Sequence, residues 1–254
     1  MLDLFGPRWH IGCSQSGLAL VRRDRFGHHT GVPVERSWQG GTSPELFLAA
    51  QLQAALDQAA CAGERVTLVL SDDWFRLGIV TPPLTPVAGW IFQTSAGTRT
   101  RSRKPCLSAA LPVHVHSALQ DILARNRLRG VQLMPHCLAA WTRWQGELDR
   151  DDWFGTVHDG RLMLISRANG KMIALMQQSL TEDDMRMPDR LDRPVRTASD
   201  RSGWPLPPRI VLCGEVPQPW TVASPGRLVC IPLREKNLPA GSLAVALAQA
   251  GIAA

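Results

Sequence analysis

The sequence lacks the two most common glycine-rich phosphate loops, since neither G-x-x-x-x-G-K-[ST] nor G-x-G-x-x-G occurs in it. It also lacks the G-x-S-x-G elbow that exposes a serine nucleophile. No uncharged apolar run approaches the roughly 18 residues that span a bilayer, and the N-terminus lacks the basic region and apolar run of a signal peptide. These absences argue against a P-loop or dinucleotide site and against a serine hydrolase, and we expect a cytoplasmic protein.

Tyrosine is also absent, and none of the six cysteines belongs to a C-x-x-C pair. The cysteines stand singly, mostly in apolar surroundings, at Cys13, Cys61, Cys106, Cys137, Cys213 and Cys230. This spacing is typical of reduced thiols in a protein core. The chain has 254 residues, 44% of them hydrophobic and 20% charged. It can therefore bury a core without disulfides or metals, as one large domain or two closely packed subdomains.

The formal net charge is +6, and part of the excess is local. Four basic residues cluster in the segment 95–105, namely Arg99, Arg101, Arg103 and Lys104. Such a cluster can contact an anionic membrane face or nucleic acid, but most charge runs are solvated loops. We interpret the segment first as a solvated basic loop and keep the two kinds of contact as alternatives.

The stretch 65–82 predicts the centre of a sheet. Its two apolar runs, 66–70 and 75–80, flank the short polar turn Ser71-Asp72-Asp73, as expected for two buried strands joined by a tight connection. The stretch ends in a Pro-rich segment that cannot continue a sheet.

Further strands and helices follow from the same periodicities. The turns Asp159-Gly160 and Asn169-Gly170 are strong hairpin signals and predict a three-stranded meander over 153–177. The other predicted strands are 10–13, 18–22, 106–111, 130–134, 209–213 and 228–231, and the predicted helices are 43–63, 112–127, 135–148 and 242–250. The segment 186–208, which carries prolines and arginines, is expected to be a linker.

No acidic pair in the sequence indicates a catalytic acid and base. Asp72-Asp73, Asp151-Asp152 and Asp183-Asp184 are adjacent in sequence, and each is explained as a turn or a helix start. Asp159 lies at the tip of an ordinary Asp-Gly turn, and turn chemistry explains it. We predict no metal site, because the histidines are not spaced to share a metal.

One kind of nucleotide site stays open to this sequence. Two β-hairpins that face each other across a cleft can grip phosphates with the amides of their turns. The residues that would line such a cleft are Gly12, Ser14 and Ser16 in the first hairpin, Gly160 in the second, and Gly214 on the far wall.

The order of these elements resembles the actin-like cytoplasmic assembly proteins of bacterial pilus and type II secretion machines, the PilM family and the cytoplasmic part of GspL. The segments that carry the resemblance are HIGCSQSGLALVRR, VTLVLSDDWFRLGIVTPP, 106–127, VQLMPHCLAAWTRWQGEL, WFGTVHDGRLMLISRANGKMIALMQQSL and RIVLCGEV. The resemblance covers 9–216 and depends on pattern and element order more than on invariant residues.

The resemblance implies an α/β protein with an actin-like (ribonuclease H-like) fold of two intimately packed subdomains, 1–130 and 131–254, with mixed sheets, flanking helices and a degenerate nucleotide cleft. The family's nucleotide binders open with D-x-G, where this chain has His10-Ile11-Gly12. The second hairpin reads His158-Asp159-Gly160-Arg161, a plain tight turn, and Cys213-Gly214-Glu215 has one glycine where the adenosine motif has two. These departures predict a pseudo-ATPase.

By the same resemblance we expect a non-catalytic scaffold that binds the cytoplasmic tail of a PilN-like inner-membrane protein, peripheral at that membrane and without a bound cofactor. The alternatives are an active actin-like ATPase or kinase that uses ATP and Mg²⁺, and a nucleic-acid-binding protein that uses the basic loop.

Overall fold

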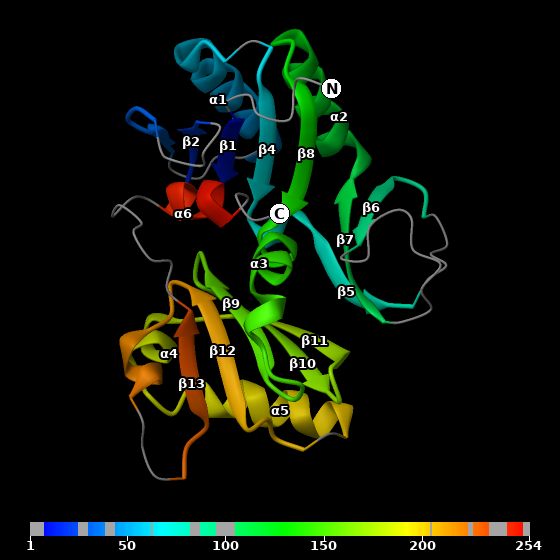
Figure 1. The fold of residues 1–254 in the computed structure, drawn as a ribbon, viewed down its shortest axis with the longest axis vertical. Coiled ribbons are helices and arrows are strands. Elements are labelled where there is room, and N and C mark those ends of the chain that lie inside the picture. Colours follow the sequence, from blue (N-terminus) through cyan, green and yellow to red (C-terminus); the bar gives the residue numbers. More distant parts are fainter. Residues whose placement is uncertain are drawn as a thin grey trace.

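The structure is a computed structural model and describes residues 8–24, 30–38, 44–61, 63–81, 87–94, 105–203, 205–222, 226–233 and 243–250. Its strands form two five-stranded sheets and one three-stranded sheet (Figure 1). The two larger sheets share one pattern, in which an antiparallel meander of three strands is extended by two parallel strands. We call them the first sheet and the second sheet, and the third one the small sheet.

The first sheet has the strand order β3-β2-β1-β4-β8. Its strands are β1 (Arg8–Cys13), β2 (Gly17–Arg23), β3 (Val34–Ser37), β4 (Arg65–Leu70) and β8 (Arg129–Pro135). β1 and β2 pair antiparallel with Cys13 opposite Leu18, so the turn between them spans only 14–16. This is the predicted first hairpin.

The second sheet has the strand order β11-β10-β9-β12-β13. Its strands are β9 (Trp153–His158), β10 (Arg161–Ala168), β11 (Lys171–Ser179), β12 (Arg209–Gly214) and β13 (Val229–Leu233). The predicted meander is present, because β9, β10 and β11 pair antiparallel through the turns at Asp159-Gly160 and Asn169-Gly170. Asp159 and Asn169 both have positive φ angles, 54° and 51°, which Asp and Asn tolerate better than most residues.

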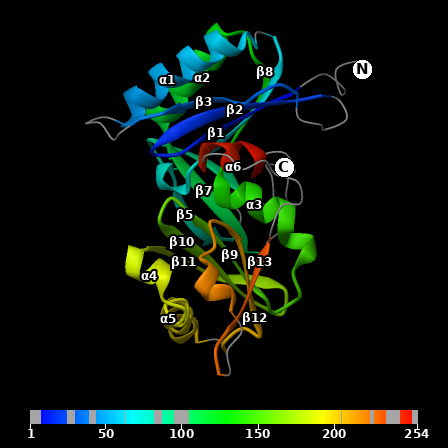
Figure 2. The same cartoon turned by 90° about the vertical axis from the view of Figure 1, so that its left-hand side faces the viewer.

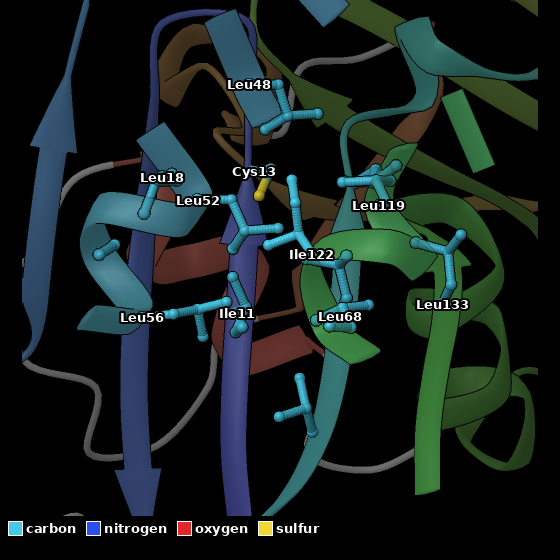
Figure 3. Close-up of a cluster of buried hydrophobic side chains, with 14 of the residues drawn as sticks. Ile11, Cys13, Leu18, Leu48, Leu52, Leu56, Leu68, Leu119, Ile122 and Leu133 are labelled. Carbon is cyan, nitrogen blue, oxygen red and sulfur yellow. The ribbon is translucent and has the colours of Figure 1, made fainter. Parts of the chain in front are cut away.

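Two helices cover one face of the first sheet, α1 (Pro44–Ala59) and α2 (Val113–Arg125). Side chains alternate along the strands, so Leu18 and Leu20 of β2 face these helices, while Ala19 and Val21 face the other side. Figure 3 shows the resulting core, in which leucines and isoleucines of α1 and α2 interdigitate with those of β1, β2, β4 and β8. We call this sheet with α1 and α2 the first lobe.

The second sheet is covered on one face by α5 (Asp192–Ser202), preceded by the short α4 (Glu182–Arg186). Leu162 and Leu164 of β10 face the cluster that contains α5, and Met163 and Ile165 face the opposite cluster. We call this sheet with α4 and α5 the second lobe.

Two helices lie between the lobes, α3 (His136–Trp144) and α6 (Leu243–Ala250), as Figures 1 and 2 both show. α6 packs on β1 and β2 on the face opposite α1 and α2 (Figure 2), and α3 contacts both β8 and β9. The chain therefore passes from one lobe to the other through α3 and returns before α6.

The small sheet has the order β5-β7-β6 and lies beside both lobes. Its strands are β5 (Arg76–Val80), β6 (Trp90–Thr94) and β7 (Cys106–Pro112). Leu77, Ile79 and Leu107 of this sheet share an apolar cluster with Phe154 and Met163 of the second sheet. This cluster joins the small sheet to the second lobe through packed side chains.

The prediction of a single sheet centre over 65–82 is wrong. β4 belongs to the first sheet, whereas β5 pairs with β7 in the small sheet. The connection between them is a short 3-10 helix, Asp72–Trp74, and not the tight reversal that a hairpin needs. Its Asp72 carboxylate accepts a hydrogen bond from the backbone N–H of Cys137, at 2.9 Å, which fixes the turn on α3.

Three predicted boundaries also need correction. The expected linker 186–208 contains α5, because Leu191, Val195 and Ala198 form a helical stripe that is buried on the second sheet. β8 belongs to the first sheet and α6 packs against that sheet, whereas the predicted boundary places both in the subdomain 131–254. The helix predicted over 43–63 ends earlier, at Ala59. The next residue, Ala60, has a positive φ of 48°, three positions before Gly63.

The six cysteines are free and buried, as predicted. Among the helices of the described ranges, none is long and apolar enough to cross a membrane.

Candidate functional site

The turns of the two hairpins meet at the junction of the lobes. The backbone N–H of Gln15, in the turn between β1 and β2, donates a hydrogen bond to Oδ2 of Asp159, in the turn between β9 and β10, at 3.2 Å. The backbone N–H of Asp159 donates in turn to Oε2 of Glu215, just beyond β12, at 3.2 Å. The structure thus brings together the three segments in which the sequence predicted a cleft.

The serines of the first hairpin stabilise its own turn. Ser14 is buried, and its Oγ accepts hydrogen bonds from the backbone N–H groups of Ser16 and Gly17, at 3.2 Å and 2.9 Å. The Ser14 hydroxyl lies 3.1 Å from the carbonyl oxygen of Gly17, to which it donates. Ser16 is exposed, and its hydroxyl lies 3.2 Å from that of Ser14. Two amides that a phosphate would need are already bound to a side chain.

Two of the predicted glycines allow close backbone packing. A Cβ on Gly12 would lie 2.0 Å from the carbonyl oxygen of Ala244 in α6, so Gly12 is the point where α6 approaches β1. A Cβ on Gly214 would lie 2.2 Å from the carbonyl oxygen of Val157, and Gly214 has a φ of 93°. Gly160 completes the tight turn, with a φ of 68°.

Three histidines lie on elements that meet at this junction. His10 on β1, His136 at the start of α3 and His158 at the end of β9 are all buried. The rings of His136 and His158 lie 4.8 Å apart, centroid to centroid. Burial lowers the pKa of His136 to about 4, and burial together with His136 lowers the pKa of His158 to about 2. Both imidazoles are therefore neutral at neutral pH, and the described residues provide no hydrogen-bond partner for Nδ1 of His136 or Nε2 of His158.

Two aspartates that follow β4 connect the lobes at the same place. Nε of Arg161 on β10 lies 2.5 Å from Oδ1 of Asp73, and the Asp73 side chain is only 5% exposed. Burial raises the pKa of Asp73 in spite of Arg161. The neighbouring Asp72 is more deeply buried, and burial raises its pKa to about 6. The first lobe thus presents two carboxylates to the second lobe.

A small pocket lies between these groups. Its lining residues are mostly polar and come from both lobes, namely Ser71, Asp72, Asp73, Thr156, His158, Arg161, Met163 and Gln177. The enclosed volume of the pocket is about 10 Å³, which is room for about one water molecule and is far below the roughly 300 Å³ at which small-molecule sites begin. Within the described ranges, no three His, Cys, Asp or Glu side chains are grouped so that they could hold a metal ion.

Sequence reasoning missed most of the residues that make this junction. It treated Asp159 and the pair Asp72-Asp73 as turn residues, and it gave no role to Gln15 or Arg161. The predicted cleft places the two turns opposite each other, but the specific contact between Gln15 and Asp159 could not be predicted, because 144 positions separate these residues. The available signal was that His10 stands where the D-x-G motif of the resembled family has its carboxylate, and the structure shows a further buried histidine, His136, beside His158. The basic cluster Arg99, Arg101, Arg103 and Lys104 lies outside the described residues.

No family model matches this sequence, and no curated protein matches it. Solved structures do match. A PilM–PilN type IV pilus biogenesis complex gives a TM-score of 0.60, with 98% of this chain and 99% of that chain covered at 14% sequence identity. A Bacteroides thetaiotaomicron protein of unknown function with an actin-like ATPase fold gives 0.59, with 87% and 88% covered at 8% identity. The chain has an actin-like fold.

A third match is the cytoplasmic domain of EpsL, an inner membrane component of the Vibrio cholerae type II secretion system. Its TM-score is 0.53, with 96% of this chain and 94% of that chain covered at 11% identity. The predicted fold class is therefore confirmed, and the actin-like fold extends over nearly the whole chain. The resemblance to PilM-like and GspL-like proteins is confirmed as a likeness of fold.

Proposed function

We propose that the protein is a non-catalytic actin-like scaffold at the cytoplasmic face of a pilus or secretion assembly, where it binds the cytoplasmic tail of a PilN-like inner-membrane protein. The observation that carries the proposal is the end-to-end match to the chain from the PilM–PilN complex. The match to the EpsL cytoplasmic domain supports the same setting. In this proposal the protein is cytoplasmic and reaches the membrane through its partner.

The junction between the lobes supports the non-catalytic part of the proposal. A buried histidine stands at position 10, where the D-x-G motif has its carboxylate, and the neutral His158 stands in the second hairpin, where the resemblance leads us to expect an acidic residue or Asn. The turn amides of Gln15, Ser16 and Gly17 are already bound to protein oxygens. A nucleotide would have to displace these contacts and would meet the carboxylates of Asp73 and Asp159 as well.

The apolar cluster between the small sheet and the second lobe supports a rigid scaffold. Met172 of the second sheet is 7% exposed and packs with Leu107 of the small sheet, which is fully buried. Leu77 and Ile79 of the small sheet extend the same cluster. Moving the small sheet away from the second lobe would expose this surface to water, at a cost of about 25 cal/mol for each Å².

This non-catalytic proposal predicts that the protein does not bind ATP. We expect no rise in Tm when ATP and Mg²⁺ are added at millimolar concentration, because a ligand that binds only the folded state must stabilise it. Thermal-shift titration and calorimetry would measure this, with nucleotide-free buffer of equal ionic strength as the control. A saturable, Mg²⁺-dependent rise in Tm would favour an active ATPase instead.

An apolar patch beside the outer strand of the small sheet is our candidate for the docking surface. Val87, Ile91 and Val113 are 52%, 36% and 37% exposed. They lie close together, because Val113 donates its backbone N–H to the carbonyl of Gly89 at 2.9 Å and Ile91 pairs with Leu111. In the part of the chain that the structure describes, the outer edge of β6 pairs with no strand. An extended tail can add to such an edge and place its apolar side chains on the patch.

The test of this surface uses the tail itself. A protein that co-purifies from solubilised inner membranes is identified, and its cytoplasmic tail is made as a labelled peptide. We expect Ile91→Asp to weaken tail binding at least about tenfold, because it puts a charge into the apolar contact. Fluorescence anisotropy measures the affinity. The control is Val222→Asp, at a residue of the second lobe that is 61% exposed. Equal affinity of the two variants, or no tail binding by the parent protein, would contradict the proposal.

A further inference from the structure

Three hydrogen-bond donors and three carboxylates meet at the hairpin turns. The backbone N–H of Gln15 donates to Asp159 at 3.2 Å, and the backbone N–H of Asp159 donates to Glu215 at 3.2 Å. The guanidinium of Arg161 lies 2.5 Å from the carboxylate of Asp73. These two amides and the guanidinium thus already face anions that belong to the protein.

The contact between Gln15 and Asp159 is the one that directly joins the two turns. The other amides of the first turn are bound within their own hairpin, Ser14 to the carbonyl of Gly17, and Ser16 and Gly17 to the Ser14 hydroxyl. The Gln15 amide is directed out of that turn, and its partner is a charged oxygen from the other lobe. Hydrogen bonds to an ionised acceptor are about twice as strong as neutral ones.

We propose that Asp159 is an intramolecular latch, a carboxylate that occupies the anion position of the first hairpin, holds the two turns together and keeps outside phosphate groups away. The proposal goes beyond tail binding and does not depend on it. Asp159 is held at the tip of a rigid hairpin, so its local concentration at Gln15 far exceeds that of a free anion. Asp73 and Glu215 lie nearby and add like-charge repulsion against phosphate.

The test removes the carboxylate and keeps the turn. Asp159 has a φ of 54°, which glycine adopts without strain, so Asp159→Gly removes the latch with little change in the backbone. The matched control is Asn169→Gly, at the same position of the next hairpin in the same sheet, where φ is 51°. Each variant adds one glycine, so the two gain similar conformational freedom in the unfolded chain.

The probe is inorganic phosphate at constant ionic strength. We expect the Tm of Asp159→Gly to rise by about 3 °C or more as phosphate reaches roughly tenfold its dissociation constant. We expect no such rise for the parent protein or for Asn169→Gly. The amide signal of Gln15 in a ¹⁵N correlation spectrum should exchange with solvent faster in Asp159→Gly, and phosphate should protect it again.

Several outcomes would overturn the latch. One is an unchanged exchange rate of the Gln15 amide in Asp159→Gly, and another is phosphate stabilisation that is equal in the parent protein or in Asn169→Gly. If Asp159→Gly fails to fold, Asp159→Asn keeps the shape and the tolerance for positive φ while it removes the charge. For Asp159→Asn we expect a smaller rise in Tm with phosphate than for Asp159→Gly. Tail affinity measured on the same variants separates failure of the latch from failure of the scaffold proposal.

Discussion

Gly12→Ala is expected to destabilise the protein by about 3 kcal/mol or more, which lowers Tm by roughly 6–12 °C. The added Cβ would lie 2.0 Å from the carbonyl oxygen of Ala244, 2.3 Å from the backbone nitrogen of Ala248 and 2.7 Å from Cβ of Leu247. All three atoms belong to or lie next to the backbone of α6, so no side chain can rotate away. The helix must shift off β1 or the sheet must deform.

The matched control is Gly78→Ala. Gly78 also lies in a strand, and a Cβ added to it would have open space within 4 Å. We expect that variant to stay within about 0.5 kcal/mol of the parent protein. Thermal unfolding measures both variants, and limited proteolysis of the C-terminal helix shows whether α6 has detached. Equal Tm values for the two variants would contradict the packing role of Gly12.

This result would also separate two explanations of the glycine in His10-Ile11-Gly12. A phosphate-binding glycine can be replaced with loss of ligand binding and little loss of stability. A glycine that lets a helix lie on a strand cannot be replaced without a large loss of stability. The contacts of Gly12 favour the second explanation.

Asp152→Asn is expected to destabilise the protein by about 2–3 kcal/mol, or roughly 5–10 °C in Tm. The Asp152 side chain is fully buried just before β9, and it binds Arg209, the first residue of β12. Nε of Arg209 donates to Oδ1 of Asp152 at 2.9 Å, Nη2 of Arg209 donates to Oδ2 at 2.6 Å, and the backbone N–H of Asp149 donates to Oδ2 at 2.8 Å. The pair therefore fixes the start of two adjacent strands, and an amide can keep only part of these bonds.

The effect of Asp152→Asn should depend on pH. Burial acts to raise the pKa of Asp152, but the hydrogen bonds from Arg209 and from the Asp149 amide outweigh it, and the pKa lies below its ordinary value. A carboxyl whose pKa is lower in the folded state adds stability above its unfolded pKa, near 3.9, and loses it as the pH falls through the folded pKa. The difference in the free energy of unfolding between the parent protein and Asp152→Asn should be largest near pH 7 and should become smaller below about pH 4.

The control for charge removal is Glu182→Gln. Glu182 pairs with Arg186 on α4, and the two side chains are 85% and 75% exposed, so we expect a change within about 0.5 kcal/mol. Chemical denaturation at several pH values measures both variants. If the difference in the free energy of unfolding between the parent protein and Asp152→Asn stayed constant from pH 7 to pH 3, Asp152 would not act through its charge.

Much of the fold could be predicted from the sequence, because strong local signals coincide with the elements that formed. The Asp-Gly and Asn-Gly turns set the meander from β9 to β11, and the apolar stripe Leu119, Ile122 and Leu123 set the inner face of α2. α5 was missed because its composition is polar and proline-containing. The apolar stripe that packs it on the sheet is short, with Val195 and Ala198 inside the helix and Leu191 just before it.

The sequence by itself determined the periodic strands and helices and the buried thiols, because each of these depends on residues close together in the chain. The tertiary structure decided which strands share a sheet, so β5 left β4 and paired with β7. It also decided which polar groups meet, since Gln15 with Asp159 and Asp73 with Arg161 are distant in sequence. Contacts of that kind depend on how the two lobes pack, and local sequence patterns do not indicate how the lobes pack.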